Sequence, residues 1–338
     1  MKGMIIDMIK VALIGAGRMG KIHYDAYNSI PDVKVIAAQD VDLETAKARI
    51  NDPDVIFYDN LDLMLEQENI DMVDICSPTY LHAEHAIKAI SKGFHTICEK
   101  PISLSVDKAQ QIVDATRKHN VFFMVAQVIR FWPEYEYLKK AYDEKIYGNL
   151  NQILFTRVGE MTKTSWQDWM RDINKSGMAP IDLHIHDVDF ILHMLGKPKA
   201  ITSFSRQNGK NISWINTHYE YNDDVMVEAE GAWYDPKFPF SMSYRASFEN
   251  AILEYKANKL ILYNNDGSTS QIQLEEVKSN SQLNVGSVNG YFYELEYFVN
   301  CVKSNTPPER ITPDESIISL QIVLKELESA KSGKKILL

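Results

Sequence analysis

The sequence predicts an α/β protein with two domains, and two observations carry this prediction. The first part of the 338-residue chain alternates short apolar runs with amphipathic helical patterns, which is typical of a parallel sheet covered on both faces. The later part contains long runs in which apolar and polar residues alternate, as in strands with one buried face. A chain of this length also exceeds the size at which a single core stops growing.

A glycine-rich turn near the N-terminus identifies the first domain. An apolar run at 10–14 precedes Gly15, Gly17 and Gly20, and residues 21–28 continue as a helical pattern. Asp40 lies 20 residues after Gly20 and ends the second apolar run, 33–38. This strand, G-x-G-x-x-G turn, helix and acidic residue form the fingerprint of a Rossmann dinucleotide-binding domain, which we place at 1–126.

The remaining elements follow from the hydrophobic pattern in chain order. In the first domain we predict strands at 11–14, 33–38, 72–76, 95–98 and 121–125, with helices at 81–91 and 106–119. The second domain, 127–338, begins with an amphipathic helix at 133–147 that ends at Gly148. Its alternating runs predict a large open, mostly antiparallel sheet with strands at 151–158, 200–205, 225–233, 241–247, 260–263 and 271–274. Helices at 291–303 and 312–332 close the chain, and their packing back on the first domain is an alternative arrangement.

Composition excludes several classes of partner. The chain carries 36 basic and 46 acidic side chains, and this net charge of −10 disfavours nucleic acid or an anionic membrane surface. No apolar run reaches the roughly 20 residues that span a bilayer, and Asp7 interrupts the short apolar patch at the N-terminus. Three scattered cysteines indicate a reducing, cytoplasmic location and neither a disulfide framework nor a zinc site.

Two segments follow strands of the predicted parallel sheet, where ligands bind in such folds. Ser77, Pro78 and Thr79 follow the strand at 72–76, and His82 lies on the next helix. Glu99 and Lys100 follow the strand at 95–98, and Pro101 restricts the lysine to extended backbone conformations. A lysine held there would lie near the nicotinamide end of a dinucleotide, whereas an ordinary solvated loop lysine is the alternative interpretation.

A polar stripe on a helix is the second candidate for chemistry. Pro180 marks a helix start, and Asp182, His186, Asp189 and His193 recur at i, i+4, i+7 and i+11. A carboxylate one turn from a histidine can hold the imidazole in one tautomer and raise its basicity. His184 and His186 are two residues apart and point in different directions on a helix, so we predict no metal site. A structural, hydrogen-bonded histidine is the alternative interpretation.

Together these residues resemble the glucose–fructose oxidoreductase / inositol dehydrogenase / rhizopine-catabolism family. The resemblance includes the glycine turn, the Ser77-Pro78-Thr79 loop, Glu99-Lys100-Pro101, the Asp182–His186 pair and the stretch at 130–133. It implies a second domain whose open sheet builds homodimers or homotetramers, a nicotinamide cofactor, and a sugar or polyol substrate. The catalytic lysine, aspartate and histidine of the family fall on Lys100, Asp182 and His186. The segment 162–175 does not match any one member.

We therefore predict an NAD-dependent oxidoreductase that transfers a hydride between nicotinamide and a secondary hydroxyl or ketone of a sugar, inositol or related polyol. NAD is favoured over NADP because the Asp40 carboxylate would accept bonds from a ribose and repel a 2′-phosphate. Lys100, Arg130, Trp169, Asp182 and His186 are the predicted substrate-binding residues. For Arg130 and Trp169, as for Gln127, a structural role is the alternative interpretation. The predicted cofactor-binding residues are Gly15, Ala16, Gly17, Arg18, Met19, Asp40, Ser77, Pro78, Thr79, His82, Glu99, Lys100 and Gln127.

Two other functions remain open at this point. The same fold supports glycoside cleavage through transient oxidation by a retained NAD, with no net redox change. It also supports a nucleotide-responsive binding protein without catalysis, a function that the presence of both Lys100 and His186 disfavours.

Overall fold

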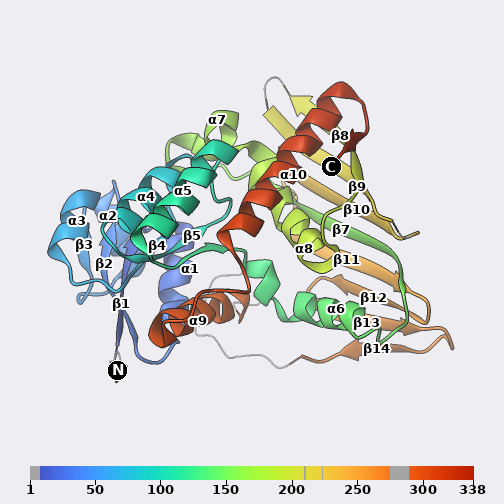
Figure 1. Ribbon diagram of the computed structural model, residues 1–338, viewed down its shortest axis with the longest axis horizontal. Coiled ribbons are helices and arrows are strands. Elements are labelled where there is room, and N and C mark those ends of the chain that lie inside the picture. The colour runs from blue at the N-terminus through green and yellow to red at the C-terminus, as the bar shows by residue number, and fades with distance from the viewer. Residues whose placement is uncertain (1–7, 209–210, 223, 275–288) are drawn as a thin grey trace. The chain divides into compact units, whose positions relative to one another are not determined.

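The computed structural model describes residues 8–208, 211–222, 224–274 and 289–338. The chain divides into two compact units (Figure 1). The first comprises the described residues of Met1–Phe131 and Val277–Ile317, and the second comprises those of Trp132–Glu276 and Ile318–Leu338. No helix among the described residues is both long enough and apolar enough to cross a membrane.

The first unit is built on a parallel sheet of six strands in the order β3-β2-β1-β4-β5-β6. Its strand order reverses at β1, which pairs with β2 on one side and with β4 on the other. Ligands bind at such a switch point because the connections leave the sheet in opposite directions there. The strands are β1 (Ile9–Ile14), β2 (Val33–Gln39), β3 (Ile56–Tyr58), β4 (Met72–Ile75), β5 (His95–Glu99) and β6 (Phe123–Ala126).

Helices connect and cover these strands. Side chains of Asp42, Asn60 and Ser105 accept bonds from free backbone N–H groups and so begin three of them. Helix α1 packs against α9, and α4 packs against α5 (Figure 1). The helices are α1 (Arg18–Tyr27), α2 (Leu43–Ile50), α3 (Leu61–Gln67), α4 (His82–Ser91), α5 (Val106–His119) and α9 (Asn289–Ser304), with 3₁₀ turns at Thr79–Leu81 and Val128–Phe131.

The second unit contains a nine-stranded sheet in the order β14-β13-β12-β11-β7-β10-β9-β8-β15. Strands β7 and β10 pair in parallel at its centre, and the other neighbours pair antiparallel. The strands are β7 (Leu150–Glu160), β8 (Ala200–Asn208), β9 (Asn211–Glu220), β10 (Met226–Tyr234), β11 (Ser241–Phe248), β12 (Ala251–Lys256), β13 (Lys259–Asn264), β14 (Thr269–Ile272) and β15 (Ile336–Leu337).

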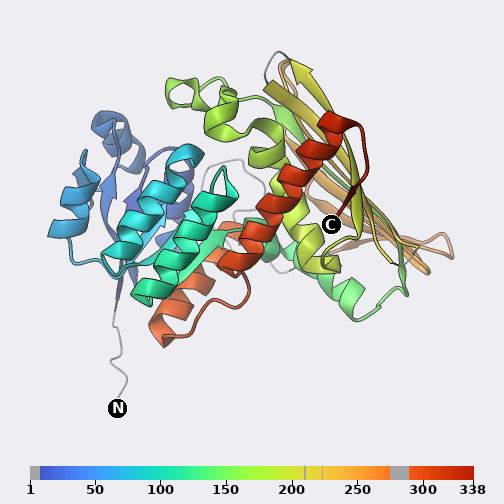
Figure 2. The same ribbon diagram turned by 45° about the horizontal axis from the view of Figure 1, so that its top comes forward.

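Helices cover one face of this sheet, and Figure 2 shows α8 and the later part of α10 on that face. No described helix covers the opposite face. The helices are α6 (Pro133–Asp143), α7 (Ile173–Ser176), α8 (Ile185–Leu195) and α10 (Pro313–Ser332); a 3₁₀ turn at Trp166–Arg171 and a π-helix at Ala179–His184 precede α8. The first residues of α10, up to Ile317, belong to the first unit.

The structure confirms the predicted fold class, with a Rossmann-type parallel sheet and a second, mostly antiparallel sheet. It adds strands β3, β9, β12 and β15, for which no separate run was predicted. The helix predicted from Pro180 begins as a π-helix and becomes α-helical only at Ile185. Strand β14 starts two residues before the predicted run at 271–274, in register with β13, its one described neighbour.

Candidate active site

The glycine turn between β1 and α1 shows why each glycine is required. Gly15 has a φ of 93°, and a Cβ there would lie 2.8 Å from the Ser77 backbone nitrogen. A Cβ on Gly20 would lie 2.1 Å from the Gly15 carbonyl oxygen, so helix and turn pack without space for a side chain. A Cβ on Gly17 would meet no atom within 4 Å. The turn therefore has no room for a side chain at Gly15 and Gly20, whereas the space beside Gly17 is open. Helix α1 begins at this open position without a side-chain cap.

Asp40 connects the end of β2 to this turn. Its Oδ2 accepts a 2.8 Å bond from the Ala16 N–H, and its Oδ1 accepts a 3.0 Å bond from the Asp42 N–H. Arg49 donates to the Ala16 carbonyl at 3.1 Å. A carboxylate offers about four lone-pair directions, so two remain for ribose hydroxyls. The local geometry thus fits NAD; the contacts of the glycine turn with the pyrophosphate and of Asp40 with a ribose stay predictions.

His82 connects two loops at the carboxyl end of the sheet. Its Nδ1 lies 2.7 Å from the Pro101 carbonyl oxygen and its Nε2 lies 2.9 Å from the Ser77 carbonyl oxygen. Burial lowers the pKa of the His82 imidazole. Thr79 and Glu99 are also buried. His82 therefore orders the loop that follows β4 and the loop that follows β5, and its cofactor contact stays a prediction.

Lys100 is half-buried at the end of β5, at the position the sequence predicted. Its backbone N–H donates a 3.0 Å bond to Oε2 of Glu99. Gln127 follows β6, is 2% exposed, and its Oε1 has no hydrogen-bond partner among the described residues. A buried acceptor of this kind is costly unless a ligand or water satisfies it, which fits a cofactor contact.

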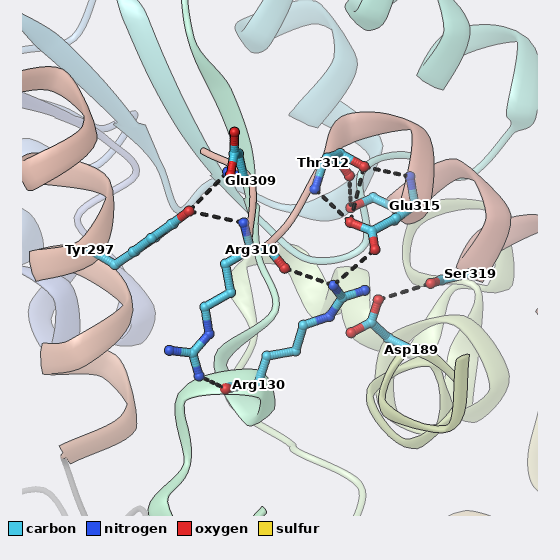
Figure 3. A network of polar contacts seen from close by, with 9 residues as sticks. Arg130, Asp189, Tyr297, Glu309, Arg310, Thr312, Glu315 and Ser319 are labelled. Carbon is cyan, nitrogen blue, oxygen red and sulfur yellow. Dashed lines mark hydrogen bonds and ion pairs between the residues drawn. The ribbon is translucent and has the colours of Figure 1, made fainter. Parts of the chain in front are cut away.

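Arg130 has contacts that fit the structural role, which the sequence leaves open beside a role in the pocket wall. Its side chain is 2% exposed and donates to the Arg310 carbonyl at 2.9 Å, while Arg310 donates back to the Arg130 carbonyl (Figure 3). Oε1 of Glu315 lies 3.5 Å from Arg130 Nη1. The Arg310 guanidinium also lies 3.8 Å from the Phe131 ring centre. Within this unit Arg130 ties the turn after β6 to the segment before α10, and its substrate contact stays a prediction.

In the second unit, strand β10 positions the helix that carries Asp182 and His186. Trp233 donates from Nε1 to Oδ2 of Asp182 at 3.1 Å. A Cβ on Gly231 would lie 2.7 Å from the Cβ of His184, so the glycine permits the π-helix to approach the strand. Asp182 is 7% exposed and His186 is half-buried. π-Helical turns are rare and are frequent at functional sites.

Two buried polar networks hold this helical segment in place. His184 Nε2 lies 3.1 Å from a carboxylate oxygen of Glu326, and the Tyr219 hydroxyl donates to Glu326 at 2.6 Å. One turn further along, Arg157 of β7 donates twice to Asp187, from Nε at 3.0 Å and from Nη2 at 2.9 Å. The structural interpretation of His184 is therefore supported. A ligand role for His184 would require breaking its contact with Glu326.

Trp169 lies half-buried in the 3₁₀ turn before α7. Gln167 and Asp168 in that turn have φ angles of 47° and 55°, values that side chains other than glycine adopt at a cost. No residue of this turn is buried, and Trp166 is 46% exposed. Trp169 is thus partly exposed, and its substrate contact stays a prediction.

Trp233 and Gly231 are parts of the candidate site that no motif in the sequence predicts. The sequence pattern predicts Trp233 only as one residue of a strand with alternating apolar and polar positions. Its bond to Asp182 joins residues that are 51 positions apart. Gly231 reads as a strand glycine, which signals a close backbone approach in general without naming the partner. Only the packing of β10 against the π-helix reveals both.

Comparison with models of known protein families shows to which family the chain belongs. Residues 9–127 match the model of an oxidoreductase family with an NAD-binding Rossmann fold, and residues 135–250 match the GFO/IDH/MocA C-terminal domain. The chain belongs to the GFO/IDH/MocA oxidoreductase family. This membership confirms the predicted family and, through the NAD-binding domain, the predicted cofactor NAD.

Curated relatives include several enzymes of sugar metabolism. D-glucoside 3-dehydrogenase of Escherichia coli is 24% identical over 97% of each chain. 2,7-anhydro-N-acetylneuraminate hydratase of the same bacterium is 27% identical over 65% of this chain and 57% of the relative. The chain spans about half the length of that protein and of oxidoreductase YrbE of Bacillus subtilis, which is 31% identical over 56% of this chain and 54% of YrbE.

Solved structures show the same fold. A levoglucosan dehydrogenase in complex with NADH and levoglucosan aligns with a TM-score of 0.85 at 18% identity, over 97% of this chain and 98% of the other. Myo-inositol 2-dehydrogenase from Lactobacillus plantarum aligns with a TM-score of 0.81 at 24% identity, over 98% and 99%. At these identities the likeness establishes the architecture of both units.

Proposed function

We propose that this protein is an NAD-dependent dehydrogenase that oxidises a secondary hydroxyl of a sugar, inositol or related polyol, or reduces the matching ketone. The observation that carries the proposal is the glycine turn, which is closed by Gly15 and Gly20, open at Gly17, and bonded to Asp40. A nicotinamide dinucleotide fits this donor and acceptor set. The family membership and the named sugar and inositol dehydrogenases among its relatives support the same reaction class.

Three residues are proposed to carry the chemistry. NAD, when bound, supplies the hydride acceptor. His186, which is half-buried on α8, is proposed to take the proton of the reacting hydroxyl. Asp182 is held by Trp233 and is proposed to orient the substrate or the histidine. Lys100 is proposed to stabilise the developing alkoxide with its positive charge.

The substrate class rests on the segment that precedes α8. Trp169 offers an aromatic face beside Asp168, Arg171 and Asp172, which is the combination that packs on the C–H side of a sugar ring and bonds its hydroxyls. The relatives named for a glucoside, levoglucosan and inositol support a cyclic polyol. Trp169→Ala should raise KM for such a substrate and leave NAD affinity unchanged.

One relative favours a second candidate function. A relative named as a hydratase of an anhydro sugar belongs to the same set, so cleavage of an ether or glycosidic bond through transient oxidation is the rival. The two functions differ in net redox change. Stoichiometric NADH accumulation with a polyol supports the dehydrogenase, whereas turnover with catalytic NAD and no NADH accumulation supports the rival.

The test compares substitutions across a panel of cyclic polyols, sugar acids and short alcohols. We expect His186→Ala and Lys100→Met to lower kcat by about 100-fold or more, the scale of general acid–base and electrostatic contributions. His193→Ala is the matched control, because that histidine lies two turns further along α8. Near-normal kcat in His186→Ala, or faster turnover of short alcohols than of every cyclic polyol, would contradict the proposal.

The open sheet of the second unit is proposed as the surface of a homodimer or homotetramer. Large apolar side chains on its strands remain exposed, with Phe204 61%, Met226 50% and Tyr263 39% exposed. A contiguous exposed apolar patch is typical of an interaction surface, and these side chains are proposed to contribute to one. Light scattering should show more than one chain, and Phe204→Glu should shift the population toward monomer.

A further inference from the structure

A buried cluster of ionisable side chains lies inside the first unit, directly behind the turn that carries Lys100. His23 of α1, Asp74 of β4 and Glu294 of α9 have no exposed surface, and Glu99 of β5 is 6% exposed. The His23 ring joins the two strands: Nδ1 lies 2.8 Å from Oδ2 of Asp74, and Nε2 lies 3.2 Å from Oε1 of Glu99. Four elements therefore meet at one imidazole.

The surroundings indicate a positively charged ring. Burial opposes the charge, but the carboxylate of Asp74 and its hydrogen bond raise the pKa of His23 well above its usual range. Burial raises the pKa of Glu99, but the contact with the charged His23 ring, with the charge of Lys100, holds it below the usual value overall. Nδ1 donates to Asp74, while Nε2 lies within ion-pair distance of Glu99 without hydrogen-bond geometry, so charge attraction joins the ring to the Glu99 carboxylate.

Glu294 limits how much negative charge the cluster holds. Neither of its carboxyl oxygens has a hydrogen-bond partner among the described residues. Burial and the neighbouring charge of Glu99 raise its pKa well above the usual value. When Glu294 is protonated, it adds no negative charge beside Glu99. The positive charges that act on Glu99 then come from His23 inside the unit and from Lys100 at the turn.

The cluster reaches Lys100 through Glu99. Oε1 of Glu99 contacts His23, and Oε2 accepts the 3.0 Å bond from the Lys100 backbone N–H. The same carboxylate is thus fixed on one side by a buried cation and fixes the catalytic turn on the other. We propose that His23 is a positioning residue for Lys100, acting through the Glu99 carboxylate; this inference rests on the proposed dehydrogenase function.

The three groups His23, Asp74 and Cys76 also have the ligand types of a metal site, with their ligand atoms within 4.8 Å of one another. Burial raises the pKa of the Cys76 thiol, which keeps it protonated and a poor ligand. Nδ1 of His23 is occupied by its bond to Asp74. We therefore favour the charge network, and elemental analysis of the purified protein tests the metal alternative.

The decisive experiment is a double-mutant cycle between His23→Gln and Lys100→Met. If His23 positions Lys100, His23→Gln lowers kcat by about 10- to 100-fold, which is the effect expected when a catalytic side chain is displaced by about 1 Å. In the Lys100→Met background the same substitution then lowers kcat by less than about twofold, because groups that act as one unit are not additive. The NADH dissociation constant of His23→Gln stays within about twofold of that of the unmodified protein. Cys76→Ala is the matched control, since it removes a cluster member without charge and retains kcat.

A second measurement does not require turnover. Hydrogen–deuterium exchange of the peptide around residues 98–102 should accelerate in His23→Gln, because Glu99 loses the cation that fixes it and releases the Lys100 N–H. Exchange in the other β-strands of the first unit should remain as in the unmodified protein. Glu99→Gln, which keeps the side-chain shape and removes the charge, provides the same test if His23→Gln does not fold.

Each outcome decides the question. Additive losses of kcat in the two variants, unchanged exchange at 98–102, or stoichiometric bound metal would overturn the positioning role. If no substrate of the panel is oxidised, the proposed function fails, and local acceleration at 98–102 still supports the link from His23 to the Lys100 turn. If His186→Ala loses activity and His23→Gln does not, the proposed function stands and this inference fails.

Discussion

Replacing Arg157 by methionine should destabilise the second unit by about 3–5 kcal/mol, because it leaves the Asp187 carboxylate buried without its cation. The Arg157–Asp187 pair is bidentate, with bonds of 3.0 and 2.9 Å, and the two side chains are 3% and 0% exposed. At about 1.4 kcal/mol per decade, this loss multiplies the unfolding equilibrium constant by roughly two to four orders of magnitude.

Tryptophan fluorescence can measure the unfolding of the second unit separately. All five tryptophans lie in the second unit, so their fluorescence during urea unfolding reports on that unit alone. The matched control is Lys325→Met, which removes an exposed pair with Glu328 at 2.7 Å, with side chains 49% and 53% exposed. An exposed pair of this kind contributes less than about 1 kcal/mol.

Two results would contradict the predicted role of the Arg157–Asp187 pair. If Arg157→Met shifts the urea midpoint no more than Lys325→Met does, the buried pair does not anchor α8. If a double variant with Asp187→Leu stays as unstable as Arg157→Met alone, the cost does not arise from an uncompensated buried charge. Because Asp187 follows His186 directly on α8, we also expect kcat to fall in Arg157→Met while the NAD dissociation constant stays constant.

Three other predictions concern the two units separately. Burial lowers the pKa of His85 to about 4, against about 6.5 in the unfolded chain. The unfolded state therefore binds a proton first as pH falls, and the stabilisation present above pH 6.5 is lost between pH 6.5 and about pH 4. His85→Gln should flatten this pH dependence of the melting temperature. Asp40→Ser should narrow a preference for NAD over NADP that we expect to be at least about tenfold in kcat/KM, and equal use of both cofactors by the unmodified protein would contradict the assignment. Trp233→Phe removes one hydrogen bond of Asp182 and should therefore lower kcat without changing NAD affinity, whereas an unchanged kcat would remove Trp233 from the site.

The nucleotide-binding half could be predicted in detail because its signals are local. A strand, a glycine turn, a helix and an acid 20 residues later specify one backbone path, and short-range sterics at Gly15 and Gly20 enforce it. The alternating runs of the second half predicted a sheet for the same reason, since side-chain direction has a period of two. The positions of Lys100, Asp182 and His186 on their elements also followed from the sequence, and their catalytic roles stay predictions.

Contacts between distant segments were decided by tertiary structure alone. The hydrophobic period predicts an α-helix from Pro180, but packing of His184 against Gly231 and Glu326 accompanies a π-helix there. The sequence leaves both a pocket role and a structural role open for Arg130, and only the structure shows its bond to a backbone carbonyl 180 positions away. The imidazole of His23 lies between two carboxylates that the chain places 51 and 76 residues later. Such partners depend on which strands become neighbours in the sheet. A local pattern of apolar and polar residues does not predict which strands pair.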